Sequence, residues 1–335
     1  MKKKIVLFSM VSLLAFLLLF GSHTNAKPFY EGKTITLIVA TSPGGGYDFY
    51  GRLMARFMQK YLPGSTIIVK NVPGAGHIIG TNEIYHAKPN GLTFGTFNRA
   101  LPLGQVAGLK GIKFDLSKMS WLGSPTTEEY SFIVSTKTPW RSLEDVMKAD
   151  KVLLSSAGVG SISHVTPILF AQMVGLTNFK LVTGYEGGEA ELAMMRGEIE
   201  GQWGSWASLR AFVEEGHGVP VMFITQKPIK GYENVPLFQN VITEEKHKPV
   251  VELMLAINVL GRPFAGPPDI PQDRLKVLQD AFAKACRDPE LLKIAEKVEK
   301  PIEFISGDEA LSLVKNLMTL PPEVLKSVKE AYGVK

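Results

Sequence analysis

Strand-like and helix-like segments alternate along this chain, and that order restricts the fold more than any other feature. The run ITLIVA at 35–40 is continuously apolar and rich in β-branched residues, as buried parallel strands are. The segment at 49–62 has apolar residues four positions apart and basic residues on another face, which predicts an amphipathic helix. Further strand-like runs lie at 65–71, 92–97, 129–136, 151–156 and 219–225. With helical segments between most of them, this order predicts an α/β fold with doubly wound sheets.

The strand, turn and helix pattern occurs in an early block and again in a middle block, and the chain from residue 271 onward reads as helical. Two blocks of this kind in a chain of this length favour two lobes over one. We expect the first lobe to comprise 27–128 and 253–335, and the second to comprise 129–252. The chain would then cross between the lobes twice.

The first 26 residues have the features of a secretory signal peptide. Three lysines at 2–4 precede an apolar run at 5–20, and 24–26 ends in small residues, as a cleavage site would. The apolar run is short for a membrane span of about 20 residues, which favours cleavage over an anchor. The mature protein is therefore expected to be soluble outside the cytoplasm.

The charges of the mature chain nearly balance. Of the 37 lysines and arginines, three lie in the signal peptide, which leaves 34 basic against 32 acidic residues. Such a surface provides no electrostatic footprint for nucleic acid. The single cysteine, Cys286, excludes an intramolecular disulfide and a thiolate-rich metal site, and His77 and His86 lack the spacing of metal ligands. We expect no metal, no cofactor and no nucleic acid partner.

Four glycine- or serine-containing turns follow strand-like runs, two in each predicted lobe. They are TSPGGGYD (41–48), NVPGAGH (71–77), SSAGVGSISH (155–164) and TGYEGG (183–188). Ligands of α/β sheets gather at the carboxyl ends of strands, where free N–H groups at helix N-termini favour an anion. Backbone N–H groups with the hydroxyls of Thr41, Ser42, Ser156 and Ser161 suit carboxylate oxygens. The turns therefore predict the two walls of a cleft that binds a carboxylate.

Several side chains near these turns have two interpretations. Asp48 could contact a ligand or accept hydrogen bonds that hold its own turn in shape. Tyr47, Tyr185 and Trp203 could line the cleft or pack in the core, as large aromatic residues usually do. His164 could close a pocket or serve a structural role.

Motifs of catalysis are missing from the sequence. It contains no phosphate-binding loop, no G-x-G-x-x-G after the first strand, no H-E-x-x-H and no G-x-S-x-G nucleophile elbow. An exported α/β protein with these turns and no catalytic set is predicted to bind a ligand rather than convert it. Two alternatives remain open: an adaptor that presents its ligand to a membrane sensor kinase, and an exported hydrolase or isomerase.

The sequence resembles the solute-binding proteins of tripartite tricarboxylate transporters, the Bug family. The likeness covers nearly all of the mature chain in order. It rests on ITLIVATSPGGGYDFYGRLMA, IIVKNVPGAGHIIGTNEI, AKPNGLTFGTF, SSAGVGSISHV, GYEGGEAELAMMRGEIEGQW and FAGPPDIPQDRLKVLQDAFAKACRDPE. The resemblance implies a type II periplasmic binding protein, with two α/β lobes and a ligand cleft between them. It implies a monomer that closes over a small organic carboxylate and delivers it to the permease subunits of such a transporter.

Carried over by position, the resemblance and the turns give a set of candidate ligand-binding residues. They are Thr41, Ser42, Gly44, Gly45, Gly46, Tyr47, Asp48, Gly160, Ser161, His164, Tyr185, Glu186, Gly187 and Trp203.

The chain departs from the family pattern at four positions. Thr41 stands where the family commonly has Phe, Asn90 where it has Asp, Val159 where it has Asn, and Glu186 where it has Lys. If Glu186 faces the pocket, it would disfavour a ligand with a second carboxylate nearby and could favour an amino group. If it faces solvent, it has no bearing on the ligand.

Overall fold

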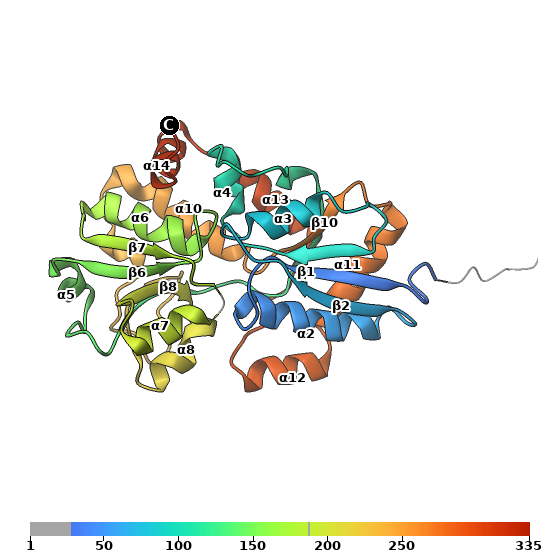
Figure 1. Ribbon diagram of the computed structural model, residues 1–335, viewed down its shortest axis with the longest axis horizontal. Helices are drawn as coiled ribbons and strands as arrows, with labels where there is room; N and C mark the ends of the chain where they lie inside the picture. The colour runs from blue at the N-terminus through green and yellow to red at the C-terminus, as the bar shows by residue number, and fades with distance from the viewer. Residues whose placement is uncertain (1–27, 187) are drawn as a thin grey trace, which may run out of the picture.

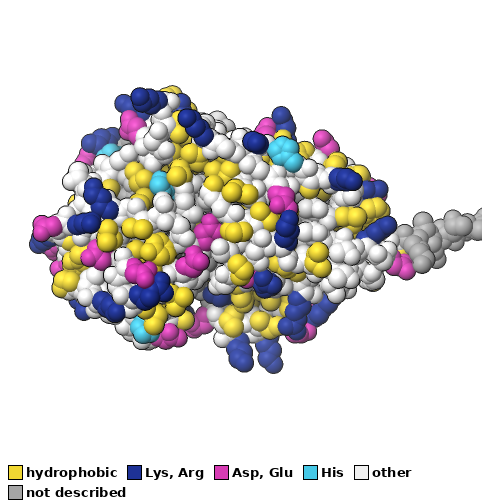
Figure 2. Space-filling view, in the orientation of Figure 1, with side chains coloured by type: hydrophobic (Ala, Val, Ile, Leu, Met, Phe, Trp, Pro, Cys, Tyr) yellow, Lys and Arg dark blue, Asp and Glu magenta, His cyan; other side chains and the backbone are white. Residues whose placement is uncertain are grey.

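The computed structural model describes residues 28–186 and 188–335, which form two α/β lobes side by side (Figure 1). The signal peptide predicted for residues 1–26 lies outside this part of the chain. Within the described ranges, no helix is both long enough and apolar enough to cross a membrane. Basic and acidic side chains are interspersed on the face shown in Figure 2, in line with the near-balance of charges in the sequence.

The first lobe is built on a mixed sheet. Its strands are, in spatial order, β11 (Ile305–Ser306), β4 (Met119–Ser124), β10 (Phe264–Pro268), β3 (Thr93–Thr96), β1 (Thr34–Val39) and β2 (Thr66–Asn71). β1 is parallel to both neighbours, with Leu37 opposite Val69 on one side and Phe94 on the other. Because β1, β2 and β3 are parallel, the turns that follow them lie at one edge of the sheet.

The second lobe is built on another mixed sheet. Its strands are, in spatial order, β7 (Phe179–Thr183), β6 (Val152–Ser156), β8 (Gly201–Ser205), β5 (Tyr130–Ser135) and β9 (Gly218–Ile224). β6 is parallel to β7 and β8, whereas β5 is antiparallel to β8 and β9. The turns after β6, β7 and β8 therefore also lie at one edge.

Helices cover the sheets. They are α2 (Gly46–Lys60), α3 (Ile78–Tyr85), α4 (Leu101–Val106), α5 (Leu143–Lys148), α6 (Ile162–Val174), α7 (Glu189–Arg196), α8 (Trp206–Glu214), α9 (Phe238–Val241), α10 (Lys248–Val259), α11 (Gln272–Cys286), α12 (Pro289–Lys297), α13 (Gly307–Leu317) and α14 (Pro322–Ala331). Side-chain caps begin some of them: Ser142 and Ser306 form capping boxes, and Asp288 accepts hydrogen bonds from the first free N–H groups of α12.

Two strands lie in the late part of the chain. β11 falls in the part from residue 271 onward that was predicted to be helical, so that prediction was wrong there, and β10 lies in a segment for which no strand was predicted. β10 pairs antiparallel with β3 and β4 and joins them into one sheet. Its sequence, FAGPP, reads as a turn because proline and glycine are poor strand formers, and its pairing with β4 shifts register between Gly266 and Pro268. The first sheet is consequently mixed rather than wholly parallel.

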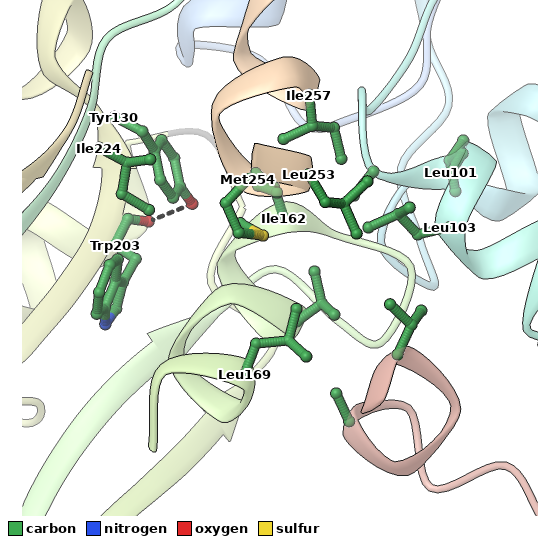
Figure 3. Packing of buried hydrophobic residues seen from close by; sticks show 14 of the residues in the cluster. Leu101, Leu103, Tyr130, Ile162, Leu169, Trp203, Ile224, Leu253, Met254 and Ile257 are labelled. Atoms are coloured by element: carbon green, nitrogen blue, oxygen red, sulfur yellow. Dashed lines mark hydrogen bonds between the residues drawn. The ribbon is translucent and has the colours of Figure 1, made fainter. Parts of the chain in front are cut away.

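The lobes share apolar packing where they meet. One cluster of buried apolar residues includes Leu101 and Leu103 of α4, Met254 of α10 and Trp203 of β8 (Figure 3). α10 lies between the two lobes in sequence, after β9 and before β10. The last helix, α14, packs against α6 of the second lobe. The predicted lobe boundaries at 128 and 252 stay a proposal, since α14 reaches across to the other lobe.

Candidate ligand-binding site between the lobes

A cavity of about 260 Å³ lies where the strand ends of the two lobes face each other. Its walls come from the turn after β1, the turn after β3, the ends of β6 and β8, and the start of α7. A larger hollow of about 670 Å³ lies beside it, around 225–230 and 295–303. The smaller cavity is the better candidate because of the polar atoms around it.

Buried polar atoms without a hydrogen-bond partner are concentrated at this smaller cavity. Among the described residues, six that line it carry such an atom: His77 Nδ1, Arg99 Nη2, Glu191 Oε2, Gln202 Nε2, Trp203 Nε1 and Ser205 Oγ. Of the described residues that line the larger hollow, only Glu128 carries a buried polar atom without a hydrogen-bond partner, its Oε2. An unpaired buried polar group costs about 1–3 kcal/mol, so a cluster of them indicates a site that a polar ligand completes.

Arg99 is the most unusual of these residues, because its side chain is only 1% exposed and the described residues provide no carboxylate for it. Its Nε donates to Asn258 Oδ1 at 3.3 Å, and its guanidinium lies 4.8 Å from the centre of the Tyr130 ring. Tyr47 Oη accepts a hydrogen bond from the Arg99 amide. A buried guanidinium with a free N–H group requires an anion as partner, and carboxylates match its geometry.

A second buried arginine lies at the start of α2. Arg262 forms an ion pair with Glu128, and both side chains are almost fully buried. Its guanidinium lies 4.3 Å from the centre of the Tyr47 ring. A Cβ atom added to Gly46 would lie 2.5 Å from Arg262 Nη2, so the glycine is what lets the guanidinium approach the helix start. The glycine turn therefore accommodates a side chain of the protein itself.

Two more ionisable residues border the cavity. Burial lowers the pKa of Lys300, whose Nζ donates to the carbonyl of Ala207 at 2.7 Å. Burial raises the pKa of Glu191, and the positive charge of Lys300 opposes that shift. Each group therefore favours the charged form of the other, because Glu191 in turn raises the pKa of Lys300.

His77 lines the cavity as a neutral imidazole. It is 3% exposed and its ring packs edge-on against Tyr47 at 4.8 Å. Burial, together with the positive charge of Arg262, lowers its pKa from 6.5 to about 3. Since the charged form cannot be accommodated, His77 can accept or donate one hydrogen bond but cannot supply positive charge.

This shift predicts a loss of stability in acid. Below pH 6.5 His77 is protonated in the unfolded state but stays neutral in the folded state. The free energy of unfolding therefore falls as the pH falls toward 3. Between pH 7.5 and 5 this residue should cost about 2 kcal/mol of unfolding free energy. His77→Asn, which tolerates the left-handed backbone at φ 77°, should show a smaller decline than wild type in urea unfolding. His86→Asn at an exposed position is the control, and an unchanged decline in H77N would contradict the assignment.

The four predicted turns meet in pairs across the cleft. Glu186 of the fourth turn contacts the first turn, where its Oε2 accepts hydrogen bonds from Thr41 Oγ1 and the Ser42 amide, each at 3.2 Å. The second and third turns touch through backbone, since a Cβ atom on Gly76 would lie 2.6 Å from the Gly160 nitrogen. Asn98 adds a further contact by accepting a hydrogen bond from the Ile162 amide at 3.1 Å.

The predicted site residues fall into two groups. Those that line the cavity are Thr41, Gly44, Gly45, Gly46, Tyr47, Tyr185 and Trp203. Those that lie outside its lining are Ser42, Asp48, Gly160, Ser161, His164 and Glu186. Gly187 falls outside the described residues.

Asp48 holds the first turn in shape. It is 5% exposed, and its Oδ2 accepts hydrogen bonds from the Gly44 amide at 3.1 Å and from Arg52 Nε at 2.9 Å. Asn71 donates to the other oxygen. Burial alone would raise the pKa of this carboxyl, but the hydrogen bonds lower it below its ordinary value. Of its two interpretations, the structural one matches these contacts.

His164 likewise contacts protein groups. Its Nδ1 lies 3.2 Å from Ser156 Oγ, which also accepts a hydrogen bond from the Gly158 amide at 3.1 Å. Burial lowers the pKa of His164. Ser156 is fully buried, and neither residue lines the cavity. This serine–histidine contact therefore fits a role in holding the third turn.

Sequence reasoning missed the residues that carry the charge of the cavity, namely Arg99, Glu191, Arg262 and Lys300, and the polar Gln202 beside them. Arg99 could have been recognised from the sequence as a candidate, because it follows the buried strand β3 at the edge of the sheet where ligands gather. Arg262 and Lys300 lie in late connecting segments, and no local pattern marks them.

The fold and this cavity define the class of protein. Two α/β lobes with a polar cavity between their strand ends form a type II periplasmic binding protein. Residues 51–310 match the model of the tripartite tricarboxylate transporter family receptor, and the chain belongs to this family.

Individual relatives agree with this assignment. A UPF0065 protein of Bordetella pertussis is 22% identical over 286 residues, which is 82% of each chain. The periplasmic binding protein BugD superposes with a TM-score of 0.75 at 19% identity, covering 91% of this chain and 99% of its own. MatC from Rhodopseudomonas palustris, solved with bound malate, has a TM-score of 0.73 at 17% identity. The superposition covers 88% of this chain and 99% of MatC. At these identities the structures establish the shared fold.

Proposed function

We propose that this protein is an exported receptor that captures a small organic carboxylate between its lobes and delivers it, unchanged, to a permease of the tripartite tricarboxylate type. The observation that carries the proposal is the buried Arg99 guanidinium, which has a free N–H group and lines the cavity between the lobes. The malate bound to MatC supports a carboxylate as ligand. Family membership supports a permease as partner and the periplasm as location.

Contacts between the lobes support a closing movement. Hydrogen bonds link Glu186 to the first turn and Asn98 to the start of α6, and residues of both lobes line the cavity. Hinge closure around a ligand is a movement that two-lobed binding proteins use. We therefore propose that the lobes open to admit the ligand and close around it.

A thermal-shift screen tests the proposed function. The mature protein is heated with mono-, di- and tricarboxylates, aromatic acids and amino acids, each beside the uncharged amide of the same acid where one exists. At 100 times its Kd, a true ligand stabilises the folded state by about 2.7 kcal/mol, which should raise the melting temperature by about 5 °C. The amides should give no shift. A folded protein that no carboxylate stabilises would contradict the proposal.

A further inference from the structure

The carboxylate of Glu186 occupies the donors that the sequence assigned to a ligand carboxylate. Its Oε2 accepts hydrogen bonds from Thr41 Oγ1 and the Ser42 amide at 3.2 Å, and from Ser42 Oγ at 3.4 Å. Glu186 is 7% exposed, so it is buried from solvent, and it does not line the cavity. Within residues 28–186 and 188–335 it has no lysine or arginine partner. The first turn thus binds a carboxylate that comes from the second lobe of the same chain.

This internal carboxylate lies directly beside the cavity. Thr41 both borders the cavity and donates to Glu186. A ligand carboxylate directed toward the first turn would have to displace Glu186 or lie next to it. Two carboxylates that share one site repel each other, and the guanidinium at this turn, Arg262, is already paired with Glu128.

The remaining charges of the cavity balance except for one. Arg262 is neutralised by Glu128. Lys300 and Glu191 carry opposite charges, and each shifts the pKa of the other toward its charged form. His77 is neutral, as its lowered pKa requires. Among the described residues that line the cavity, Arg99 is left as the one charged group without an oppositely charged partner, so the cavity has a partner for one carboxylate and none for a second.

We propose that the ligand carries a single carboxylate, which Arg99 binds, and that Glu186 excludes dicarboxylates by occupying the carboxylate-binding donors of the first turn. This inference rests on the proposed function and narrows it to one ligand class. A second, unmatched carboxylate in this cavity would lose its hydration without gaining a cation, which is costly in a buried site. Malate-binding MatC shows that the fold can hold a dicarboxylate, so the restriction would be specific to the side chains of this chain.

Calorimetric titration of acids with matched chain lengths tests this inference. Butyrate is compared with succinate, and hexanoate with adipate, in wild-type mature protein and in Glu186→Ala. Of butyrate and hexanoate, the acid that wild type binds more tightly should bind at least about tenfold more tightly than the dicarboxylate of the same chain length. E186A frees the donors of Thr41 and Ser42, so the ratio should shift toward the dicarboxylate by at least about tenfold.

Two further variants complete the experiment. Glu186→Gln keeps the size of the side chain and removes its charge, so it should shift the ratio of the two affinities toward the dicarboxylate by about threefold or more. This variant also tests the inference if E186A does not fold. Glu144→Ala removes an exposed acidic residue of the same lobe and should leave the ratio unchanged.

The outcomes separate this inference from the proposed function. Tight binding of a dicarboxylate by wild type, or an unchanged ratio in folded E186A or E186Q, would overturn the single-carboxylate inference while the receptor function stands. A folded wild-type protein that binds neither class, here or in the thermal-shift screen, would overturn the proposed function and the inference with it.

Discussion

Replacement of Arg99 by methionine is expected to weaken ligand binding by about 100-fold or more while leaving the unliganded protein at least as stable as wild type. The loss of binding follows because truncating one partner of a buried charge pair costs about 2–5 kcal/mol. Stability should be kept because the folded protein must bury an unpaired guanidinium, and methionine fills similar volume without that penalty. Opposite effects on binding and stability are typical of a residue kept for function.

The measurement pairs calorimetric titration with urea unfolding of the unliganded protein. Arg56→Met, on the exposed face of α2, is the matched control and should change neither quantity appreciably, since its side chain is 61% exposed. If R99M bound the ligand as tightly as wild type does, Arg99 would not be the anion site. If R99M strongly destabilised the unliganded protein, the residue would be structural, held by Asn258 and the Tyr130 ring.

Breaking the buried ion pair between Glu128 and Arg262 should have the largest effect on folding. Glu128→Gln removes the compensating charge from a guanidinium that is almost fully buried, and we expect a loss of about 3–5 kcal/mol of unfolding free energy. The pair joins the segment before β5 to the segment before β10, so the loss should appear as global destabilisation in urea unfolding.

A double variant and a neighbour distinguish lost charge compensation from lost packing. Glu128→Leu combined with Arg262→Met removes both charges together and should recover most of the stability lost in E128Q. Glu129→Gln, at the next position, removes an exposed carboxyl whose pKa is raised by partial burial, and it should be close to neutral. Equal effects of E128Q and E129Q would contradict the role given to the ion pair.

Local patterns in the sequence were sufficient for most of the individual elements. The apolar run at 35–40 and the periodic segment at 49–62 correspond to β1 and α2, because an unbroken apolar run and helical spacing report directly which faces of an element are buried. Ser142 caps α5, as serine favours the N-terminal cap position of helices. The local patterns did not reveal β10, whose Gly-Pro-Pro sequence is held as a strand by its two neighbours rather than by its own propensity.

The sequence predicted which turns border the cavity between the lobes, but it did not predict the contacts that these turns make. The turns after β1, β2, β6 and β7 were expected to meet, and Thr41, Tyr47 and Tyr185 do line one cavity. The glycines of the first turn were expected to expose bare N–H groups to a ligand. Instead Gly46 makes room for Arg262, and the donors of Thr41 and Ser42 bind Glu186.

The sequence by itself determined the α/β class, the order of most strands, turns and helices, and the edge at which the glycine turns lie, because these properties depend on residues close together in the chain. Only the tertiary structure decided which charges are matched. Glu186 lies 144 residues from Ser42, and Arg262 lies 134 residues from Glu128. Contacts at such separations are set by how the two lobes pack against each other, and packing of this kind leaves no periodic trace in the sequence. The candidate role of Arg99 also depends on the tertiary structure. Only the packing around it shows that its guanidinium is buried without a carboxylate partner.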